Sequence, residues 1–475
     1  MDLSKYEMMI GIEVHVELNT ESKMFCSCPT RFGALPNTQC CPVCMGFAGS
    51  LPTINEKAIE YAVKAGLVTN CKITPVSGFD RKNYFYPDLP KGYQITQYFT
   101  PICRDGYIDI DIDGGKKRIG IARIHMEEDA GKLIHDREGG TLIDHNRAGV
   151  PLIEIVSKPD MSSSDEAKAY LKKLRSIIRY IGISDCKMNE GSFRCDVNIS
   201  VRPLGTSALG VKTELKNLNS FAFAAKAIDY EFERQAEIIA SGKRIEQETR
   251  RFNETDGKTY SMRSKETDRD YRYFPEPDLP SVVVTTDMQE KVLSELPRLP
   301  DDRISAYVSE YGMSYGDSSL IASDRTLADF FEEAAGKTKY VKKLANIIIS
   351  ELIRVIDLEN FESPVSADNI SELSTLIGEE TINMSVAKKL LKRMCEKDES
   401  PRNIVEREAL AQINDADALL HFVSEAIEEN PKAVADFRAG RTVAAKTIIG
   451  KVMSKTDGRA NPTVLNEIVI NMLSN

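Results

Sequence analysis

Two closely spaced cysteine pairs near the N-terminus are the strongest local constraint on the fold. Cys26 and Cys28 form one pair, Cys41 and Cys44 form the other, and twelve residues lie between the pairs. This loop contains turn-forming glycine, proline and asparagine residues. Four thiolates on such a loop can surround one zinc ion, and a site with four protein ligands is structural. We therefore predict a structural zinc site. Cys40 could replace Cys41, and a set of reduced thiols without metal is the alternative.

The length and composition set the class of protein. A chain of 475 residues is longer than one hydrophobic core normally supports, so we expect two to four domains. Since it has no apolar stretch of about 18 residues, we predict no membrane span. The first residues, MDLSKYEMMIG, lack the pattern of a signal peptide, which favours a cytoplasmic protein with reduced cysteines.

The secondary-structure signals change along the chain. Residues 1–295 mix strand-like alternation with helices, so we predict an α+β domain that carries the zinc loop. Helical periodicity dominates afterwards, and we predict a helical domain over 296–405 and a small helical tail domain over 406–475. Pro297 to Asp302 has the composition of a linker, and a second break lies near Asp398 to Arg402.

The charge of the chain is uneven. The net charge of −10 argues against a protein that coats nucleic acid along its whole surface. From Pro431 to the end, however, seven Lys or Arg residues stand against three acids. This basic tail is a candidate for contacts with phosphates, and a lysine-rich solvated helix face is the alternative.

One N-terminal segment places ionisable side chains on a single strand face. Strand alternation from Ile10 to Leu18 puts the apolar residues on one face and Glu13, His15 and Glu17 on the other. Carboxylates beside an imidazole can hold a divalent cation such as Mg²⁺. A solvated face of an antiparallel sheet is the alternative.

Two later strand-like segments supply further acids. Residues 118–131 contain three successive acids at 127–129. In a regular strand Glu127 and Glu128 point to opposite faces, so only one of them can join a metal site. Glu154 lies in an otherwise apolar segment, and a buried carboxylate needs a partner. We predict that Glu13, His15, Glu128 and Glu154 meet at one or two Mg²⁺ ions, with the choice between Glu127 and Glu128 open.

A third polar face could hold a nucleotide. Alternation from Arg194 to Arg202 gathers polar side chains on one side of a strand. Lys216 lies in a segment that leads into a helix predicted over 221–239, and the free amides of its first turn would attract phosphate. A well-capped structural helix is the alternative.

Several motifs in the same order resemble one known family. They are E-V-H-V-E-L, F-D-R-K-N-Y-F-Y-P-D from Phe79, H-M-E-E-D-A-G-K, L-K-N-L-N-S-F, Y-R-Y-F-P-E-P-D from Tyr271 and G-K-V-M-S-K-T-D-G-R-A-N-P from Gly450. Together they resemble the B subunit (GatB) of the aspartyl/glutamyl-tRNA(Asn/Gln) amidotransferases. The resemblance runs from the first strand to the final helices.

The resemblance implies a fold, a reaction and cofactors. The fold would be a β-sheet cradle similar to that of glutamine synthetase, followed by a helical domain and a helical tail. The reaction would be the ATP- and Mg²⁺-dependent conversion of glutamate or aspartate misacylated onto tRNA(Gln) or tRNA(Asn) into the amide, through a phosphorylated acyl intermediate. By position, metal and catalytic roles fall to Glu13, His15, Glu128 and Glu154, and nucleotide or phosphate roles to Lys82, Arg194 and Lys216.

The resemblance also implies partners. Since the chain contains no glycine-rich serine segment typical of an amidase, ammonia would come from an amidase A subunit held by a small C subunit. The basic tail would contact misacylated tRNA through Lys446, Lys451, Lys455 and Arg459. The sequence does not indicate which misacylated tRNA is the substrate.

Two other functions compete with this one. A zinc-containing RNA-binding factor without catalysis would have the same cysteines and basic tail, with solvated acids. A metal-dependent hydrolase would need no ATP. The acid cluster and the buried position expected for Glu154 favour the ATP-dependent enzyme subunit.

Overall fold

The computed structural model describes residues 2–113, 115–135, 139–264, 270–356 and 361–474. The chain divides into two compact units, Met1–Pro297 and Arg298–Asn475. The division falls at the start of the segment that we predict to be a linker, and the end of that segment, Pro300 to Asp302, forms the first turn of a helix. In the described residues, no helix combines the length and apolar character needed to cross a membrane.

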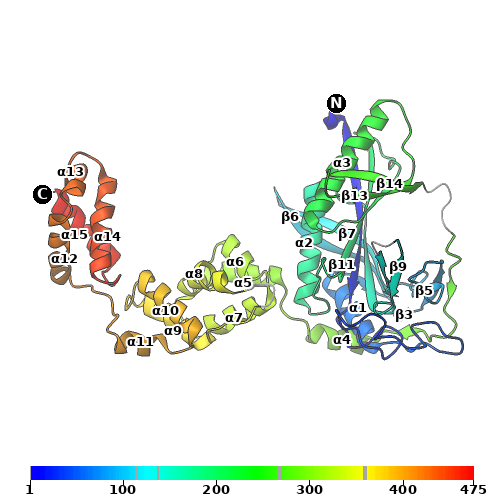
Figure 1. Cartoon of the computed structure of the whole chain (residues 1–475), viewed down its shortest axis with the longest axis horizontal. Helices are drawn as coiled ribbons and strands as arrows, with labels where there is room; N and C mark the ends of the chain where they lie inside the picture. The colour runs from blue at the N-terminus through cyan, green and yellow to red at the C-terminus, as the bar shows by residue number, and fades with distance from the viewer. Residues whose placement is uncertain (1, 114, 136–138, 265–269, 357–360, 475) are drawn as a thin grey trace. The chain divides into compact units, whose positions relative to one another are not determined.

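The first unit is built around one large mixed sheet. Among the described residues nine strands form it, in the order β14-β13-β12-β11-β1-β10-β7-β6-β2 (Figure 1). Every neighbouring pair is antiparallel except β12 and β13. In chain order the strands are β1 (Tyr6–Glu17), β2 (Lys72–Ile73), β6 (Cys103–Ile112), β7 (Gly115–Glu128), β10 (Pro151–Ser157), β11 (Phe193–Pro203), β12 (Thr213–Lys216), β13 (Glu248–Asn253) and β14 (Lys258–Ser264).

Smaller sheets, α-helices and the 3₁₀ helix η1 (Leu3–Lys5) complete the described part of this unit. The small sheets are β15-β4-β5, β16-β3 and β8-β9. Their strands are β3 (Val76–Ser77), β4 (Asp80–Asn83), β5 (Tyr93–Thr96), β8 (Lys132–His135), β9 (Thr141–Asp144), β15 (Phe274–Pro275) and β16 (Val282–Val283). The helices are α1 (Glu56–Val68), α2 (Ser164–Tyr180), α3 (Phe221–Ala240) and α4 (Thr286–Ser294). Figure 1 shows α2 and α3 side by side along the large sheet, and the two helices contact each other.

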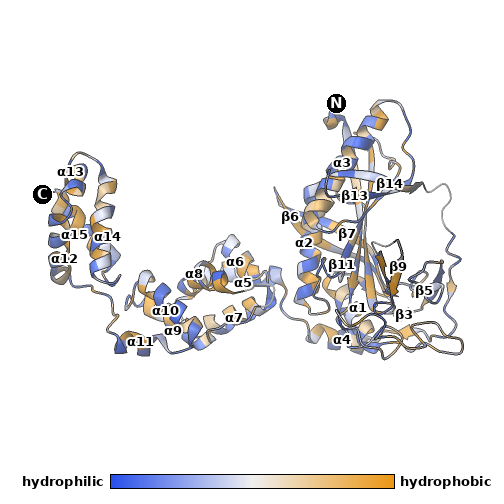
Figure 2. Cartoon of the chain, in the orientation of Figure 1, coloured by the Kyte–Doolittle hydropathy of each residue, from blue (hydrophilic) through white to orange (hydrophobic). Residues whose placement is uncertain are grey.

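The alternating sequence of β1 explains how the sheet is covered. Ile10, Ile12, Val14 and Val16 are at most 1% exposed, whereas the intervening residues are half-buried. Figure 2 shows hydrophilic and hydrophobic residues interspersed along the strands of the large sheet. Burial of an apolar side chain contributes about 1.5–3 kcal/mol, so the register of β1 is fixed by its apolar face.

The register of the sheet brings the polar residues together. His15 on β1 lies opposite Glu154 on β10 and, on its other side, opposite Arg194 on β11. Glu154 in turn lies opposite His125 on β7. Strands distant in the sequence therefore contribute to one polar face, on the side of the sheet opposite the buried apolar residues of β1.

The second unit is helical in its described residues, which confirms the predicted α+β class with a helical C-terminal region. Its elements are α5 (Pro300–Tyr311), α6 (Tyr315–Ile321), α7 (Arg325–Ala335), α8 (Val341–Ser350), the 3₁₀ helix η2 (Leu352–Val355), α9 (Ala367–Gly378), α10 (Met384–Glu396), α11 (Pro401–Arg407), α12 (Ala416–Glu428), α13 (Pro431–Arg438), the 3₁₀ helix η4 (Thr442–Ala444), α14 (Ala445–Lys455) and α15 (Pro462–Ser474). One apolar core contains buried residues from Ala306 to Val405, and a second contains residues from Leu419 to Leu473.

Candidate functional site

Three side chains from three strands converge on the polar face of the large sheet. His15 Nε2 lies 3.5 Å from Glu127 Oε1 and 3.4 Å from Glu154 Oε2. One ligand atom from each residue lies within 4.8 Å of the others. Glu127 and Glu154 are only 3% and 8% exposed. Two carboxylates and an imidazole at these distances form a donor set that suits a divalent cation. We refer to His15, Glu127 and Glu154 as the central cluster.

The short distances within the central cluster shift the pKa values of His15 and Glu154. Burial opposes the protonation of His15, but the hydrogen bond and charge of Glu154 outweigh it and raise the pKa of His15 to about 9. Burial also opposes the ionisation of Glu154, but His125 and His15 hold the pKa of Glu154 well below its ordinary value. In the absence of a metal, the imidazole therefore carries the positive charge that balances the carboxylates.

The structure corrects the carboxylate that we predicted for this position. Glu128 points away from the central cluster, where its Oε1 accepts hydrogen bonds from Lys91 Nζ and from the backbone N–H of Ile95, 2.9 Å away. Glu127 takes the position beside His15 instead. The prediction that Glu128 meets His15 and Glu154 is therefore wrong, because alternation along β7 sends these two adjacent side chains to opposite faces.

His125 is a neighbour of the central cluster that the sequence analysis did not identify. Its Nε2 lies 3.3 Å from Glu154 Oε2 and 3.9 Å from Glu127 Oε2, and the residue is 6% exposed. The signal was present in the sequence, since residues two apart in a strand share a face and His125 is two residues before Glu127. The strand register, which places His125 opposite Glu154, shows that His125 belongs beside the central cluster.

Glu13 lies next to the central cluster, on the same face of β1. Its Oε1 accepts a hydrogen bond of 2.9 Å from the Asn198 side chain. Burial and the nearby charge of Glu154 raise the pKa of Glu13. Glu13 is thus close enough to Glu154 for their charges to interact, and its predicted metal role remains a prediction.

Lys82 approaches the central cluster from β4, in a smaller sheet. Burial opposes its charge, but Glu127 and other neighbours outweigh this effect and raise the pKa of Lys82. Its Nζ also lies 5.1 Å from the centroid of the Tyr271 ring and 5.8 Å from that of Tyr84. The aromatic rings and the carboxylates together stabilise the charged form of the Lys82 ammonium group at this position.

Arg194 and Lys216 lie on the same face as the central cluster and contact carboxylates. Arg194 Nη2 lies 2.6 Å from Asp129 Oδ2 and 3.9 Å from Glu17 Oε1. Lys216 Nζ lies 2.5 Å from Asp196 Oδ2 and 3.1 Å from Glu214 Oε1. Both cations are oriented by acidic neighbours. Their predicted contacts with a nucleotide stay predictions.

The four predicted cysteines come together in the structure. The four Sγ atoms of Cys26, Cys28, Cys41 and Cys44 all lie within 4.8 Å of one another. Cys40 is outside this group, and its Sγ lies 3.9 Å from the side-chain oxygen of Asn146. The clustering confirms that the loop folds the second pair back onto the first, and four sulfurs at this spacing form a donor set that suits zinc.

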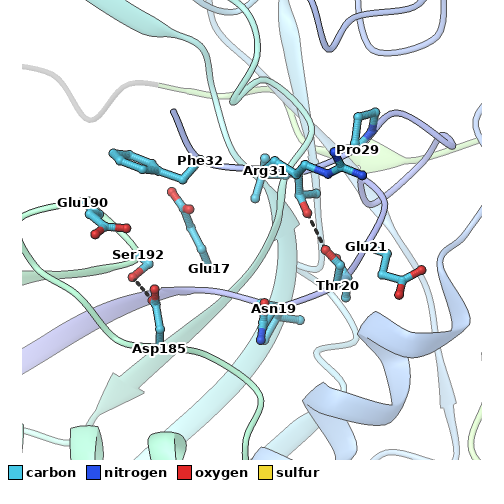
Figure 3. Close-up of a pocket in the computed structure, with 13 residues that line it drawn as sticks. Glu17, Asn19, Thr20, Glu21, Pro29, Arg31, Phe32, Asp185, Glu190 and Ser192 are labelled. Carbon is cyan, nitrogen blue, oxygen red and sulfur yellow. Dashed lines mark hydrogen bonds between the residues drawn. The ribbon is translucent and has the colours of Figure 1, made fainter. Parts of the chain in front are cut away.

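A pocket of about 740 Å³ lies where β1 runs into the cysteine loop. Figure 3 shows Glu17, Asp185, Glu190 and Ser192 together at one end of it and Arg31 at the other. Glu17 follows His15 by two residues on β1, and Arg31 belongs to the loop between the cysteine pairs. The cysteine loop therefore forms part of the wall next to the polar sheet face.

The predicted tRNA-binding residues of the tail differ in their surroundings. Lys446 and Lys451 on α14 are exposed. Lys455 Nζ lies 2.8 Å from the carboxylate of Glu425 on α12 and 2.7 Å from that of Glu429, the residue that follows α12. Arg459 donates hydrogen bonds to the backbone oxygens of Thr456 and Ala409. Lys446 and Lys451 are thus the two of the four that present their charges to solvent.

Comparison with known proteins agrees with the motifs. Residues 8–290 match the family described as the GatB/GatE catalytic domain, and residues 329–473 match the GatB domain. The B subunit of the aspartyl/glutamyl-tRNA(Asn/Gln) amidotransferase of Caldanaerobacter subterraneus subsp. tengcongensis is 50% identical over 473 residues, which cover 99% of this chain and 100% of that protein. The B subunits from Thermodesulfovibrio yellowstonii and Brevibacillus brevis are 49% and 47% identical, with 99% of this chain covered and 99% and 100% of theirs. This chain therefore belongs to the GatB family, the B subunits of the aspartyl/glutamyl-tRNA(Asn/Gln) amidotransferases.

Proposed function

We propose that this chain activates the side-chain carboxylate of glutamate or aspartate misacylated onto tRNA with ATP and then converts it to the amide with ammonia. The observation that carries the proposal is the central cluster, in which two buried carboxylates and an imidazole face Lys82. Buried ionisable groups of this kind are costly to a fold and are typical of functional sites. The relatives, which are named as B subunits of amidotransferases, support the reaction class.

The proposed reaction has two steps. A carboxylate oxygen of the aminoacyl group attacks the γ-phosphorus of ATP, and ADP leaves. The ammonia nitrogen then attacks the acyl carbon, phosphate leaves, and the nitrogen loses a proton to give the amide. The first step brings a carboxylate against the triphosphate, and in the second step negative charge develops on the carbonyl oxygen and the leaving phosphate. Catalysis of both steps therefore depends on positioning and on positive charge.

The residues of the polar face suit these requirements. His15, Glu127 and Glu154 would hold Mg²⁺, which when bound would neutralise charge on the phosphoryl oxygens. Glu13 is close enough to extend this site. Lys82, Arg194 and Lys216 would donate to phosphate or substrate oxygens, and their acidic neighbours keep them charged and oriented.

We also propose partners and a structural zinc. The ammonia would come from an amidase A subunit, and a small C subunit would hold the A and B subunits together. The tail domain, residues 406–475, would bind the misacylated tRNA through its exposed lysines. A zinc ion on the four cysteines would brace the loop that forms part of the wall beside β1.

The proposal is tested in the assembled complex with ammonium chloride as the nitrogen source, so that glutamine hydrolysis is not needed. We expect Glu127→Gln and Glu154→Gln to lower ATP-dependent amide formation by about 100-fold or more, because charge stabilisation is a large part of such catalysis. Wild-type rates in both variants would overturn the metal site. The amide formed with each charged tRNA would identify the substrate.

A zinc-containing RNA-binding factor without catalysis remains the second candidate. Its cysteine cluster and exposed tail lysines would be the same. The two functions differ in ATP turnover, because only the enzyme subunit would release ADP when misacylated tRNA and ammonia are supplied together. A metal-dependent hydrolase would instead turn over without ATP.

A further inference from the structure

The segment at the end of β9 lies between the cysteine loop and the residues that hold Arg194. It comprises residues 143–149, which begin in β9 and end just before Val150 and β10. We call these residues the connector. They belong neither to the four cysteines nor to the central cluster, yet they contact the surroundings of both. The two sites therefore share one supporting segment.

On one side, the connector is bonded through Asn37 to the loop between the cysteine pairs. The side-chain amide of Asn37 donates to the backbone oxygen of Ile143 at 3.0 Å, and its oxygen accepts from the backbone N–H of His145 at 2.8 Å. The backbone oxygen of His145 lies 3.3 Å from Lys23 Nζ, which also contacts Cys44 Sγ. The connector is thus tied to the loop and to a neighbour of one of the four cysteines.

Asn146 is the buried centre of this contact. It is 9% exposed, its side-chain amide donates to the backbone oxygen of Leu35 at 2.7 Å, and its Oδ1 accepts from the backbone N–H of Gln39 at 2.8 Å. Both partners lie between the two cysteine pairs, so a loop fixed by its cysteines holds Asn146 in place. A loop without this order would leave a buried amide short of partners, which is unfavourable.

On the other side, Arg147 holds the segment that follows β7. Its Nε donates to the backbone oxygen of Ala130 at 3.0 Å and its Nη2 to that of Gly131 at 2.9 Å. The same Nε lies 3.3 Å from Asp129 Oδ2. A Cβ atom at Gly131 would lie 3.0 Å from the backbone oxygen of Asp144, so the two segments pack directly against each other. Arg147 therefore fixes both the backbone and the acidic side chain of this segment.

Asp129 joins the connector to Arg194. It is 5% exposed, and its backbone forms hydrogen bonds of 2.9 Å with Gly149 and with Val150. Its Oδ2, the atom beside Arg147, lies 2.6 Å from Arg194 Nη2. A guanidinium group binds phosphate through a planar fork of donors, so its effect depends on its direction. The direction of Arg194 is set by the place in which Asp129 is held.

We infer that the connector makes the orientation of Arg194 depend on the order of the cysteine loop, with Asn146 and Arg147 as positioning residues. The inference rests on the proposed function, because it assumes that Arg194 donates to phosphate and that zinc orders the loop. Zinc binding and nucleotide binding then strengthen each other by the same factor, since coupling between two sites is reciprocal.

The test measures the affinity of the full-length chain for ATP with Mg²⁺ by calorimetry, first with zinc loaded and then after zinc has been removed with a chelator that is dialysed away. We expect zinc removal to weaken ATP binding at least about five-fold. Conversely, ATP with Mg²⁺ should tighten zinc binding by the same factor, measured by zinc transfer to a colorimetric chelator.

Substitutions in the connector should abolish this dependence. In zinc-loaded Arg147→Gln we expect ATP affinity to fall about three- to ten-fold, and zinc removal should then weaken it less than about two-fold further. Asn146→Ala, which breaks the contact on the side of the loop, should behave in the same way. Arg147→Lys keeps the charge without the fork of donors and should lose less ATP affinity than Arg147→Gln.

Arg118 provides the matched control. It lies near the other end of β7, where its Nε is 2.9 Å from Asp109 Oδ1, so it is also an arginine paired with an aspartate. Arg118→Gln should retain the ATP affinity and the zinc dependence of the wild type. The melting temperature of each variant checks that the fold is retained, and ATP added to Arg147→Gln corrects for any zinc that ATP binds directly.

Two kinds of result would overturn the inference. One is wild-type ATP affinity in both Arg147→Gln and Asn146→Ala, and the other is a full additional effect of zinc removal in Arg147→Gln. Arg194→Gln tests the proposed function separately, and we expect it to weaken ATP binding about ten-fold or more. Wild-type ATP affinity in Arg194→Gln would overturn the proposed phosphate contact of Arg194 instead.

Discussion

The Nζ atom of Lys23 lies 3.6 Å from the Sγ atom of Cys44, although Lys23 is completely buried. A buried ammonium group needs a compensating negative charge, and a thiolate supplies one. The pKa of the Cys44 thiol is lowered to about 4, mainly by its hydrogen bond with Cys26. Burial opposes this shift, whereas the backbone N–H of Cys41 and the charge of Lys23 add to it. Lys23 is thus an electrostatic neighbour of the cysteine cluster.

We predict that Lys23→Met weakens zinc binding about 10- to 100-fold, because groups that hydrogen-bond to metal ligands commonly contribute this much. The measurement is zinc transfer from the purified chain to a colorimetric chelator. Lys23→Arg, which keeps the charge, should lose less zinc than Lys23→Met. Equal zinc affinity in wild type and Lys23→Met would contradict a role for the ammonium group.

Glu128 is expected to contribute to stability. Its carboxylate is 3% exposed and holds Lys91 and the backbone N–H of Ile95. Glu128→Ala leaves the ammonium group of Lys91 in a buried position without its partner, which costs about 3–5 kcal/mol of unfolding free energy. The melting temperature of the first unit should therefore fall by several degrees.

The adjacent Glu127 is the matched control for this experiment. In Glu127→Gln the Glu154 carboxylate remains beside His15, so the melting temperature should fall less than in Glu128→Ala, while activity falls. If Glu128→Ala left stability unchanged, the ion pair with Lys91 would not be important to the fold.

His125 is expected to position Glu154. Its Nε2 lies 3.3 Å from the Glu154 carboxylate. In His125→Asn we predict that the Mg²⁺ concentration for half-maximal activity rises about ten-fold, while the rate at saturating Mg²⁺ is largely retained. His421→Asn, which changes an exposed side chain of the second unit, is the control. An unchanged Mg²⁺ requirement in His125→Asn would argue against this role.

The tail lysines are expected to contribute unequally to tRNA binding. Lys446→Glu and Lys451→Glu should weaken binding, and each should reduce the slope of log affinity against log salt concentration by about one. Lys455→Ala should have a smaller effect, because Glu425 and Glu429 already engage its ammonium group. Filter binding at several salt concentrations measures all three, and an equal loss in all three would contradict this difference.

Local patterns determined much of this protein. Alternation in β1 correctly placed Glu13 and His15 on the face opposite Ile10 and Ile12, because the period of a strand is fixed at two residues. The position of the cysteine pairs was likewise sufficient to predict that four thiols cluster. The helix predicted over 221–239 is α3, and Ser220 caps it through a hydrogen bond of 3.1 Å to the backbone N–H of Phe223.

The tertiary structure decided which of these residues meet. The spacing of Glu127 and Glu128 does not indicate which face of β7 is turned toward His15. The face is set by the pairing of β7 with β10, because Glu154 on β10 lies opposite both His15 and His125. The difference between Lys446, which is exposed, and Lys455, which is paired with Glu425, also depends on the packing of α12 against α14. Sequence periodicity determines the face on which a side chain lies, whereas its partners across the sheet or bundle come from long-range register, which a local pattern does not encode.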